Sequence, residues 1–366
     1  MVQQINAQTL RQLIQAESIE DVNSDELERY FREGLNPEFL PSNDYAVDPR
    51  DGTRVIFNLA RARRPHDYLD RERDEKPAES ESECPICKGQ TTKIIDCTEL
   101  SEGFTFINKN LFPIFFPSSE AVSPVASQGR SMVDDQQPGI SGFHFLQWTS
   151  SIHHHDWHNM PLEDRVVVLE RLGALEKKLM ETMDGYVSII KNYGRLVGGS
   201  LTHPHQQIAV SPILPNRQRQ NQDYFDAHGE TFSAYMQREN PSELEIRDYR
   251  TAVLLIPYFM RRPFDMLLLL KDTSKAHLFL LDREELSAVA DGWRDAIRIM
   301  LGVLQRIGRD PAYNVITHNG PGAGLSFEFL PYSQEMGGFE QLGLYICQGN
   351  PHQAAGEARA AIDLQE

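Results

Sequence analysis

Apolar positions along much of the chain follow two different periods. A helical period runs from Pro161 to Met183 and again from Asp282 to Ile307, where Asp282 and Glu285 have the spacing of an N-terminal capping box. Short apolar segments flank both helices and predict strands. In chain order these segments read FHFLQWTS, YVSIIKN, HPHQQIAVSP, PFDMLLLLK, YNVITHNG and LSFEFLP.

The order strand, helix, strand, glycine-rich turn, strand therefore occurs twice, at similar length. This repeat predicts an α+β fold made of two strand–helix–strand–strand halves with antiparallel sheets. We expect a helical extension over residues 1–45, a first half over residues 46–225 and a second half over residues 226–366. At the start of the first half, YAVDPRDGTRVIFNLA predicts two short strands joined by a turn at Pro49 and Gly52.

The chain of 366 residues is 40% hydrophobic, which is enough for a large core and for two domains or two similar halves. Its 36 basic and 53 acidic residues give a formal net charge of −17, which argues against a nucleic-acid-binding surface. An anionic nucleotide gains no long-range attraction here, so a phosphate site must be built from local cations and backbone donors. The polar N-terminal sequence and the short apolar runs predict a cytoplasmic protein without a membrane span.

The sharpest local feature is the segment GGSLTHPHQQ from Gly198 to Gln207. If HPHQQIAV is a strand, its period of two puts His203, His205 and Gln207 on one face. The glycines let backbone N–H groups approach a phosphate closely, and an imidazole can attack phosphorus to form a labile phosphoramidate. A bare H-x-H is common, so a pair of structural histidines is the alternative interpretation.

A C-x-x-C at Cys84 and Cys87 is the second feature. Two thiolates at this spacing suit one tetrahedral zinc but supply only half of its ligands, and the chain has no second C-x-x-C, so the others would be histidines. The candidates are His203, His153, His154, His155 and His158. A redox C-x-x-C is the alternative, which the proline inside the motif and the lack of a helix-opening pattern after it disfavour.

Three arginines in four residues, Arg61, Arg63 and Arg64, follow the expected hairpin. In an acidic chain such a cluster is a candidate for the local phosphate clamp, because guanidinium groups bind phosphate oxygens in a bidentate manner. A solvated basic turn is the alternative interpretation.

Together these segments resemble the galactose-1-phosphate uridylyltransferase family, a branch of the histidine-triad superfamily, from about residue 45 onward. GGSLTHPHQQI is similar to the family's active-site motif G-x-S-x-x-H-P-H-x-Q, and ECPICKG is similar to its zinc element. The other similar segments are DPRDGTRVIFNLARARRP, NLFPIF, GFHFLQWTSSIH, KNYG and TAVLLIPYFMRRPFDMLLLLK.

The resemblance implies a histidine-triad fold and a structural zinc on two cysteines and two histidines. The implied zinc ligands are Cys84, Cys87, His153 and His203, with His154 and His155 as alternatives to His153. His205 is implied as the nucleophile and Gln207 as the group that orients the phosphate. The implied substrate contacts are Arg61, Arg64, Asn110, Asn192 and Ser200.

Two departures from the family pattern limit what the resemblance implies. Some members carry a second metal site, formed by a glutamate and histidines. Here Asn221 stands at the glutamate position, Glu328 replaces a histidine, and only His318 remains of the histidines. We therefore expect this site to be absent and the second half to be non-catalytic. The C-terminal segment GGFEQLGLYICQGNP matches the family's sugar-recognition segment only loosely. The sugar is therefore undetermined, and phosphorylases such as ADP-glucose phosphorylase are equally similar there.

From the resemblance we expect a homodimeric nucleotidyltransferase that acts on nucleoside-diphosphate sugars and sugar 1-phosphates by a ping-pong mechanism through a nucleotidyl-histidine. The alternative enzyme is a phosphorylase that uses inorganic phosphate as acceptor, with a nucleotide sugar or a dinucleoside polyphosphate as donor. From a different class, a nucleotide-binding sensor without turnover is the third hypothesis, and the intact HPH-x-Q argues against it.

Overall fold

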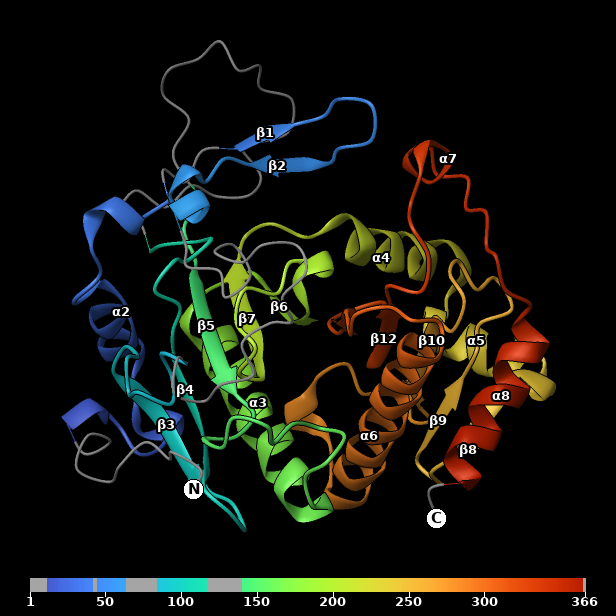
Figure 1. The fold of residues 1–366 in the computed structure, drawn as a ribbon. Helices are drawn as coiled ribbons and strands as arrows, with labels where there is room; N and C mark the ends of the chain where they lie inside the picture. Colours follow the sequence, from blue (N-terminus) through green and yellow to red (C-terminus); the bar gives the residue numbers. More distant parts are fainter. Residues whose placement is uncertain (1–11, 42–44, 64–83, 118–139, 365–366) are drawn as a thin grey trace. The chain divides into compact units, whose positions relative to one another are not determined.

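The computed structural model describes residues 12–41, 45–63, 84–117 and 140–364 (Figure 1). The chain divides into two compact units, each built from segments that are distant in sequence. Unit 1 comprises residues 1–153, 171–189 and 205–220, and unit 2 comprises residues 154–170, 190–204 and 221–366. The division into halves expected from the sequence stays a prediction. No helix within the described ranges is both long and apolar enough to cross a bilayer.

Unit 1 is built on four antiparallel strands, with a separate two-stranded hairpin (Figure 1). Its elements are α2 (Ser24–Arg32), β1 (Tyr45–Val47), β2 (Arg54–Ile56), β3 (Ile94–Glu99), β4 (Phe104–Lys109), β5 (Phe143–Trp148) and β7 (His205–Ser211). Phe143 and Phe145 of β5 share one face and pack edge-on against Phe31 of α2, with ring centroids 5.3 Å apart in both pairs. Helix α2 therefore packs on the face of β5 that is opposite to His144.

Unit 2 contains antiparallel strands covered by a long helix, α6 (Arg283–Arg306). Its strands are β8 (Glu245–Asp248), β9 (Ala252–Leu255), β10 (Met266–Leu270), β11 (Tyr313–His318) and β12 (Ser326–Pro331). The capping box predicted from Asp282 and Glu285 opens α6, so this prediction is confirmed. Trp293 of α6 is 1% exposed and packs against Phe327 and Phe329 of β12.

The strands follow the order β3-β4-β5-β7-β6-β11-β12-β10-β9-β8, with β6 spanning Tyr186–Tyr193, and every described register is antiparallel. The predicted α+β class with a large antiparallel sheet is confirmed. Helix α3 (Leu162–Thr182) follows β5 as expected. Along the chain, β5–α3–β6–β7 and β10–α6–β11–β12 therefore have the same order of strands and helix. Within the sheet, the neighbours β5-β7-β6 correspond to the neighbours β10-β12-β11. The duplication itself stays a prediction, which this correspondence supports.

Several helices have no counterpart in the apolar pattern. Helix α4 (Asn216–His228) has the sequence NRQRQNQDYFDAH, and because this sequence is polar on nearly every side, its periodicity carries no helical signal. The other helices outside the apolar pattern are α5 (Phe232–Glu239), α7 (Gly338–Gln341) and α8 (Pro351–Asp363). Short 3-10 turns span Ile19–Asp21, Pro37–Phe39, Leu59–Arg63, Arg195–Val197, Ser242–Leu244 and Leu278–Leu280.

The HPH segment differs from its expected conformation. Strand β7 begins at His205, so the prediction of a shared strand face holds for His205 and Gln207 and is wrong for His203. Pro204 has no N–H to donate to a ladder, and the pairing with β5 ends at Trp148 and His205. His203 therefore lies in the turn ahead of the strand.

An ion pair in unit 2 is almost completely buried. Lys191 Nζ lies 3.1 Å from Asp156 Oδ2, and each side chain is 1% exposed. Burial lowers the pKa of Lys191, and the nearby carboxylate of Asp156 opposes that shift. The Tyr313 hydroxyl lies 3.5 Å from the same carboxylate oxygen. The ion pair thus connects the segment that begins at residue 154, which contains Asp156, to Lys191 of β6.

Replacing one partner of this pair is expected to destabilise the protein strongly. Lys191→Met leaves the Asp156 carboxylate buried without its cation, which should lower the free energy of unfolding by about 3–5 kcal/mol. Urea unfolding followed by circular dichroism measures the change. The additional substitution Asp156→Leu should recover most of the loss, because it removes the uncompensated charge.

The matched control is Lys271→Met, which removes an exposed lysine 2.8 Å from Asp248. Since solvent screens that pair, its loss should cost less than about 1 kcal/mol. Equal costs for Lys191→Met and Lys271→Met would contradict the role assigned to the buried pair.

Candidate functional site

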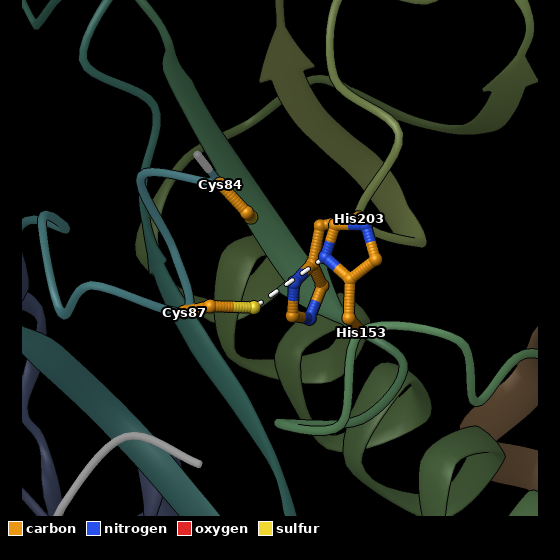
Figure 2. A group of neighbouring side chains, drawn as sticks. All are labelled: Cys84, Cys87, His153 and His203. Atoms are coloured by element: carbon orange, nitrogen blue, oxygen red, sulfur yellow. Dashed lines mark hydrogen bonds between the residues drawn. The ribbon is translucent and has the colours of Figure 1, made fainter. Parts of the chain in front are cut away.

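Four buried side chains from distant parts of the sequence converge in one cluster, which Figure 2 shows. Cys84, Cys87, His153 and His203 are 0–6% exposed, and one potential ligand atom from each lies within 4.8 Å of those of the others. The Sγ of Cys87 is 3.4 Å from the Nδ1 of His153. We call this group the cysteine–histidine cluster.

Backbone geometry explains how the two cysteines come to face the same point. The chain turns tightly after Cys84, where the N–H of Lys88 donates to the Cys84 carbonyl at 3.1 Å and the N–H of Gly89 donates to the Ile86 carbonyl at 2.8 Å. Gly89 has a φ of +73°, a conformation that glycine adopts without strain. The turn places both thiols on its inner side, as a metal knuckle requires.

Strand pairing explains the positions of the two histidines. Because β5 and β7 are antiparallel, the residues that follow β5 and the residues that precede β7 lie at the same end of the ladder. His153 comes five residues after Trp148, the end of β5, and His203 comes two residues before His205, the start of β7. Of the three neighbouring histidines, His153 joins the cluster, whereas His154 is exposed and His155 is half-buried outside it.

The donor set fits a tetrahedral metal. Bond lengths of about 2.0–2.3 Å to nitrogen and sulfur imply ligand atoms about 3.3–3.8 Å apart, a spacing that the contact between Cys87 and His153 already has. Neither cysteine forms a disulfide in the structure. The cluster could therefore bind a metal ion through two thiolates and two imidazoles, a set typical of structural sites.

Beyond the cluster, β7 carries His205 and Gln207 on one face. His205 is 7% exposed, and its ring packs against the indole of Trp148 with centroids 4.8 Å apart. The indole is held in turn, because its N–H donates to the Oδ1 of Asn108 at 2.9 Å. Gln207 is half-buried, and its Oε1 lies 3.2 Å from the Nε2 of His144 on β5.

Sequence reasoning did not identify His144 and Trp148. Both alternate with Leu146 on the face of β5 that lies beside His205 and Gln207. The alternation in FHFLQWTS was the available signal, but it becomes useful only once β5 is known to pair with β7.

Two of the predicted substrate contacts lie on the segment beside His144. Asn110 accepts a hydrogen bond from the N–H of Phe112 through Oδ1 at 2.9 Å, and its Nδ2 lies 3.4 Å from His144 Nε2. Arg61 donates from Nη1 to the carbonyl of Phe112 at 2.7 Å. Arg61 and Asn110 thus both contact the backbone of Phe112, and Asn110 and Gln207 both lie beside the Nε2 of His144. Arg64 lies outside the described residues.

The other two, Asn192 near the end of β6 and Ser200, flank the glycine-rich turn. Asn192 Oδ1 accepts from the Nδ2 of Asn314 at 2.7 Å, so its amide orientation is set within unit 2. Gly194 has a φ of +89°, and a Cβ there would lie 2.2 Å from the carbonyl of Pro311. A larger residue at this position would push the turn away from β11, and Ser200 is half-buried at the far end of the same turn.

The positions expected to replace a second metal site also meet in unit 2. His318 Nε2 lies 3.2 Å from Glu328 Oε2, and Asn221 Nδ2 lies 3.3 Å from His318 Nδ1. This trio offers one imidazole and one carboxylate, with an amide in place of a further acidic ligand. The expected absence of a second metal stays a prediction.

No family model matches the sequence. Among characterised proteins, the chain is similar to an ADP-glucose phosphorylase of Arabidopsis thaliana, with 26% identity over 340 residues that cover 86% of this chain and 92% of that protein. It is also similar to the galactose-1-phosphate uridylyltransferase of Haemophilus influenzae, with 31% identity over 133 residues. The second match covers 34% of this chain and 38% of that protein.

Solved structures share the fold over nearly their whole length. A uridylyltransferase superposes with a TM-score of 0.66 at 18% identity, covering 88% of this chain and 99% of that one. The crystal structure of an ADP-glucose phosphorylase from Arabidopsis thaliana with bound ADP-glucose superposes with a TM-score of 0.60 at 21% identity, covering 86% and 97%.

The sequence match, the fold and the cysteine–histidine cluster lead to the same group of enzymes. One relative aligns along almost all of its length, and the fold of two solved structures extends along almost all of theirs. By sequence the chain is similar to ADP-glucose phosphorylase and to galactose-1-phosphate uridylyltransferase, and it has the fold of the uridylyltransferases.

Proposed function

We propose that this protein transfers a nucleoside monophosphate from a nucleoside-diphosphate sugar to a phosphate acceptor through a covalent bond to His205. The observation that carries the proposal is the arrangement of His205 and Gln207 on one face of β7, directly after a histidine of the cysteine–histidine cluster. A nucleophile and a phosphate-orienting amide are thereby placed side by side on a rigid strand. Proposed substrate contacts are Arg61, Arg64, Asn110, Asn192 and Ser200.

The transfer has two balanced steps. The imidazole of His205 attacks the α-phosphorus, so that a P–N bond forms, the P–O bond to the sugar phosphate breaks, and sugar 1-phosphate leaves. An oxygen of the acceptor then attacks the same phosphorus, a P–O bond forms and the P–N bond breaks. Gln207 donates an amide N–H to a phosphoryl oxygen, and this hydrogen bond strengthens as charge develops there.

We propose sugar 1-phosphate as the acceptor and inorganic phosphate as the second candidate. The first choice follows the resemblance of the active-site motif to the uridylyltransferases. The second is favoured by one observation: the relative that aligns over 92% of its length is named ADP-glucose phosphorylase. A homodimer and a cytoplasmic location remain predictions.

We further propose that the cysteine–histidine cluster holds one zinc ion with a structural role. When bound, zinc would keep His203 in the turn ahead of β7 and so restrict the backbone of His205. Cys84, Cys87, His153 and His203 would be its ligands, and no step of the transfer requires the metal to touch the substrate.

Replacing the nucleophile is expected to abolish both the adduct and turnover. Wild-type enzyme given a nucleotide sugar labelled in the α-phosphate should retain about one nucleotidyl group per active chain, in an acid-labile and alkali-stable linkage typical of a phosphoramidate. His205→Ala should retain none, because no other group at this position can attack phosphorus. Filter binding of the denatured protein measures the label.

His228→Ala is the matched control, since His228 lies on α4, is exposed and has no role in the proposed transfer. It should retain the adduct at the wild-type level. Label exchange between sugar 1-phosphate and nucleotide sugar at the wild-type rate in His205→Ala would show that the covalent mechanism is wrong.

Neighbouring glutamines on β7 are expected to behave differently. Gln207→Ala should lower the rate of adduct formation about 10²–10³-fold with little change in unfolding temperature, because it removes a transition-state hydrogen bond. Gln206 faces the other side of β7, where it accepts a hydrogen bond from Thr149 at 2.9 Å, and it is fully buried. Gln206→Ala should therefore lower the unfolding temperature while changing the adduct rate much less. Single-turnover kinetics and calorimetry measure the two effects, and the reverse pattern would contradict the assignment.

Zinc content provides the test of the metal proposal. About one zinc per chain should copurify with the protein, and His153→Ala should lose most of it, because three ligands hold zinc less tightly than four. His154→Ala is the matched control and should keep a full complement. Elemental analysis measures both variants. Wild-type protein without zinc, or equal zinc loss in the two variants, would contradict the assigned ligand set.

A further inference from the structure

His144 is a buried polar side chain beside Gln207 and has no role in the proposed transfer so far. It lies on β5, is 1% exposed, and projects from the face that also carries Trp148, which packs against His205. Three groups of the described residues lie near its ring nitrogens: the N–H of Ile114 is 3.1 Å from Nδ1, Gln207 Oε1 is 3.2 Å from Nε2, and Asn110 Nδ2 is 3.4 Å from Nε2.

The backbone N–H of Ile114 decides which ring nitrogen of His144 carries the proton. An amide N–H can only donate, so Nδ1 must present its lone pair to it. A neutral imidazole with a lone pair on Nδ1 carries its hydrogen on Nε2. The Nε2–H of His144 is therefore a donor, and the acceptor it faces is the Oε1 of Gln207.

This tautomer also settles the orientation of the Gln207 amide. A donor at His144 Nε2 attracts the carbonyl oxygen of Gln207 and repels its NH₂ group. The NH₂ group of Gln207 is consequently turned to the other side of the amide, where it can donate to a ligand. Without His144, the two amide orientations would differ little in energy, and one of them presents an oxygen to an anionic phosphate.

The orientation of the Asn110 side-chain amide can be assigned in the same way. Its Oδ1 is occupied by the N–H of Phe112, so its Nδ2 lies toward His144. Because His144 Nε2 carries a hydrogen, the two nitrogens are both donors and do not bond to each other. Asn110 and Gln207 thus both have an NH₂ group that His144 does not accept, and such donors have the polarity that phosphoryl oxygens need.

We propose that His144 is a positioning residue that holds the Gln207 amide with its NH₂ group toward the phosphate, through an Nε2–H hydrogen bond to Gln207 Oε1. This inference rests on the proposed function, since it deepens the role given to Gln207. It assigns to His144 no contact with the reacting atoms.

The test is a double-mutant cycle on the rate of adduct formation. His144→Phe keeps a ring of similar size but has neither nitrogen, and it should slow the first half-reaction about tenfold, as loss of one orienting hydrogen bond implies. In the Gln207→Ala background the same substitution should change the rate less than about twofold, because the group that it positions is gone. His144→Gln retains a side-chain NH₂ donor and should recover part of the rate.

His228→Phe makes the same chemical change at an exposed position and should leave the rate unchanged in both backgrounds. An equal rate loss from His144→Phe in the wild-type and Gln207→Ala backgrounds would overturn the proposal, since it would show that His144 acts through packing alone. Melting temperature and zinc content identify a variant that has lost its fold.

A second measurement does not depend on activity. Nitrogen-15 NMR of histidine-labelled wild-type protein, with the His144 resonances assigned by their absence in His144→Phe, should show the Nε2–H tautomer. An Nδ1–H tautomer would overturn the proposal whatever the kinetics. If the wild-type enzyme forms no adduct with any nucleotide sugar, the proposed function fails, and the tautomer still decides whether His144 orients Gln207.

Discussion

The antiparallel pairing of β5 with β7 is the constraint on which the candidate site depends. It sets Trp148 opposite His205 and Leu146 opposite Gln207, so that the side chains of both strands alternate onto a common face. It also brings the residues after β5 and before β7 to the same end of the ladder, where His153 and His203 meet the two cysteines. A register shift of one residue would turn His205 and Gln207 to the other face and separate the two histidines.

The described contacts between His144, Gln207 and their neighbours are made by amides, an imidazole and a backbone N–H. The chain has a net charge of −17, and the described groups around Gln207 are amides, an imidazole and backbone N–H groups. Such groups bind an anion only when their donors are oriented beforehand, because each buried donor or acceptor that lacks a partner costs free energy. The fixed amides of Asn110 and Asn192 and the packed indole of Trp148 are consistent with this requirement.

The two strand–helix–strand–strand segments show how one arrangement can carry different chemistry. In the first, the final strand begins with His205. In the second, strand β12 carries Glu328, whose Oε2 lies 3.2 Å from the Nε2 of His318. The similar sheet order with different residues is consistent with one segment for transfer and another for packing or binding.

The sequence by itself determined the class of the fold and the types of chemistry that are available. Periodicity predicted α3, α6 and the core strands, because burial of one apolar face leaves a regular trace in the chain, and the capping box marked the start of α6. The HPH-x-Q and C-x-x-C motifs could be recognised because each depends on a short spacing within the sequence. The polar helix α4 left no such trace and was missed.

Only the tertiary structure decided which of three adjacent histidines joins the cluster and that His203 precedes the strand. Both outcomes depend on where the ladder between β5 and β7 ends, and Pro204 sets that end by lacking an N–H. The positions of His144 and Trp148 beside Gln207 and His205 were likewise decided by the fold, since Gln207 lies 63 residues from His144 in sequence. Contacts across strands depend on register, which is a property of the whole sheet and has no local signature in the chain.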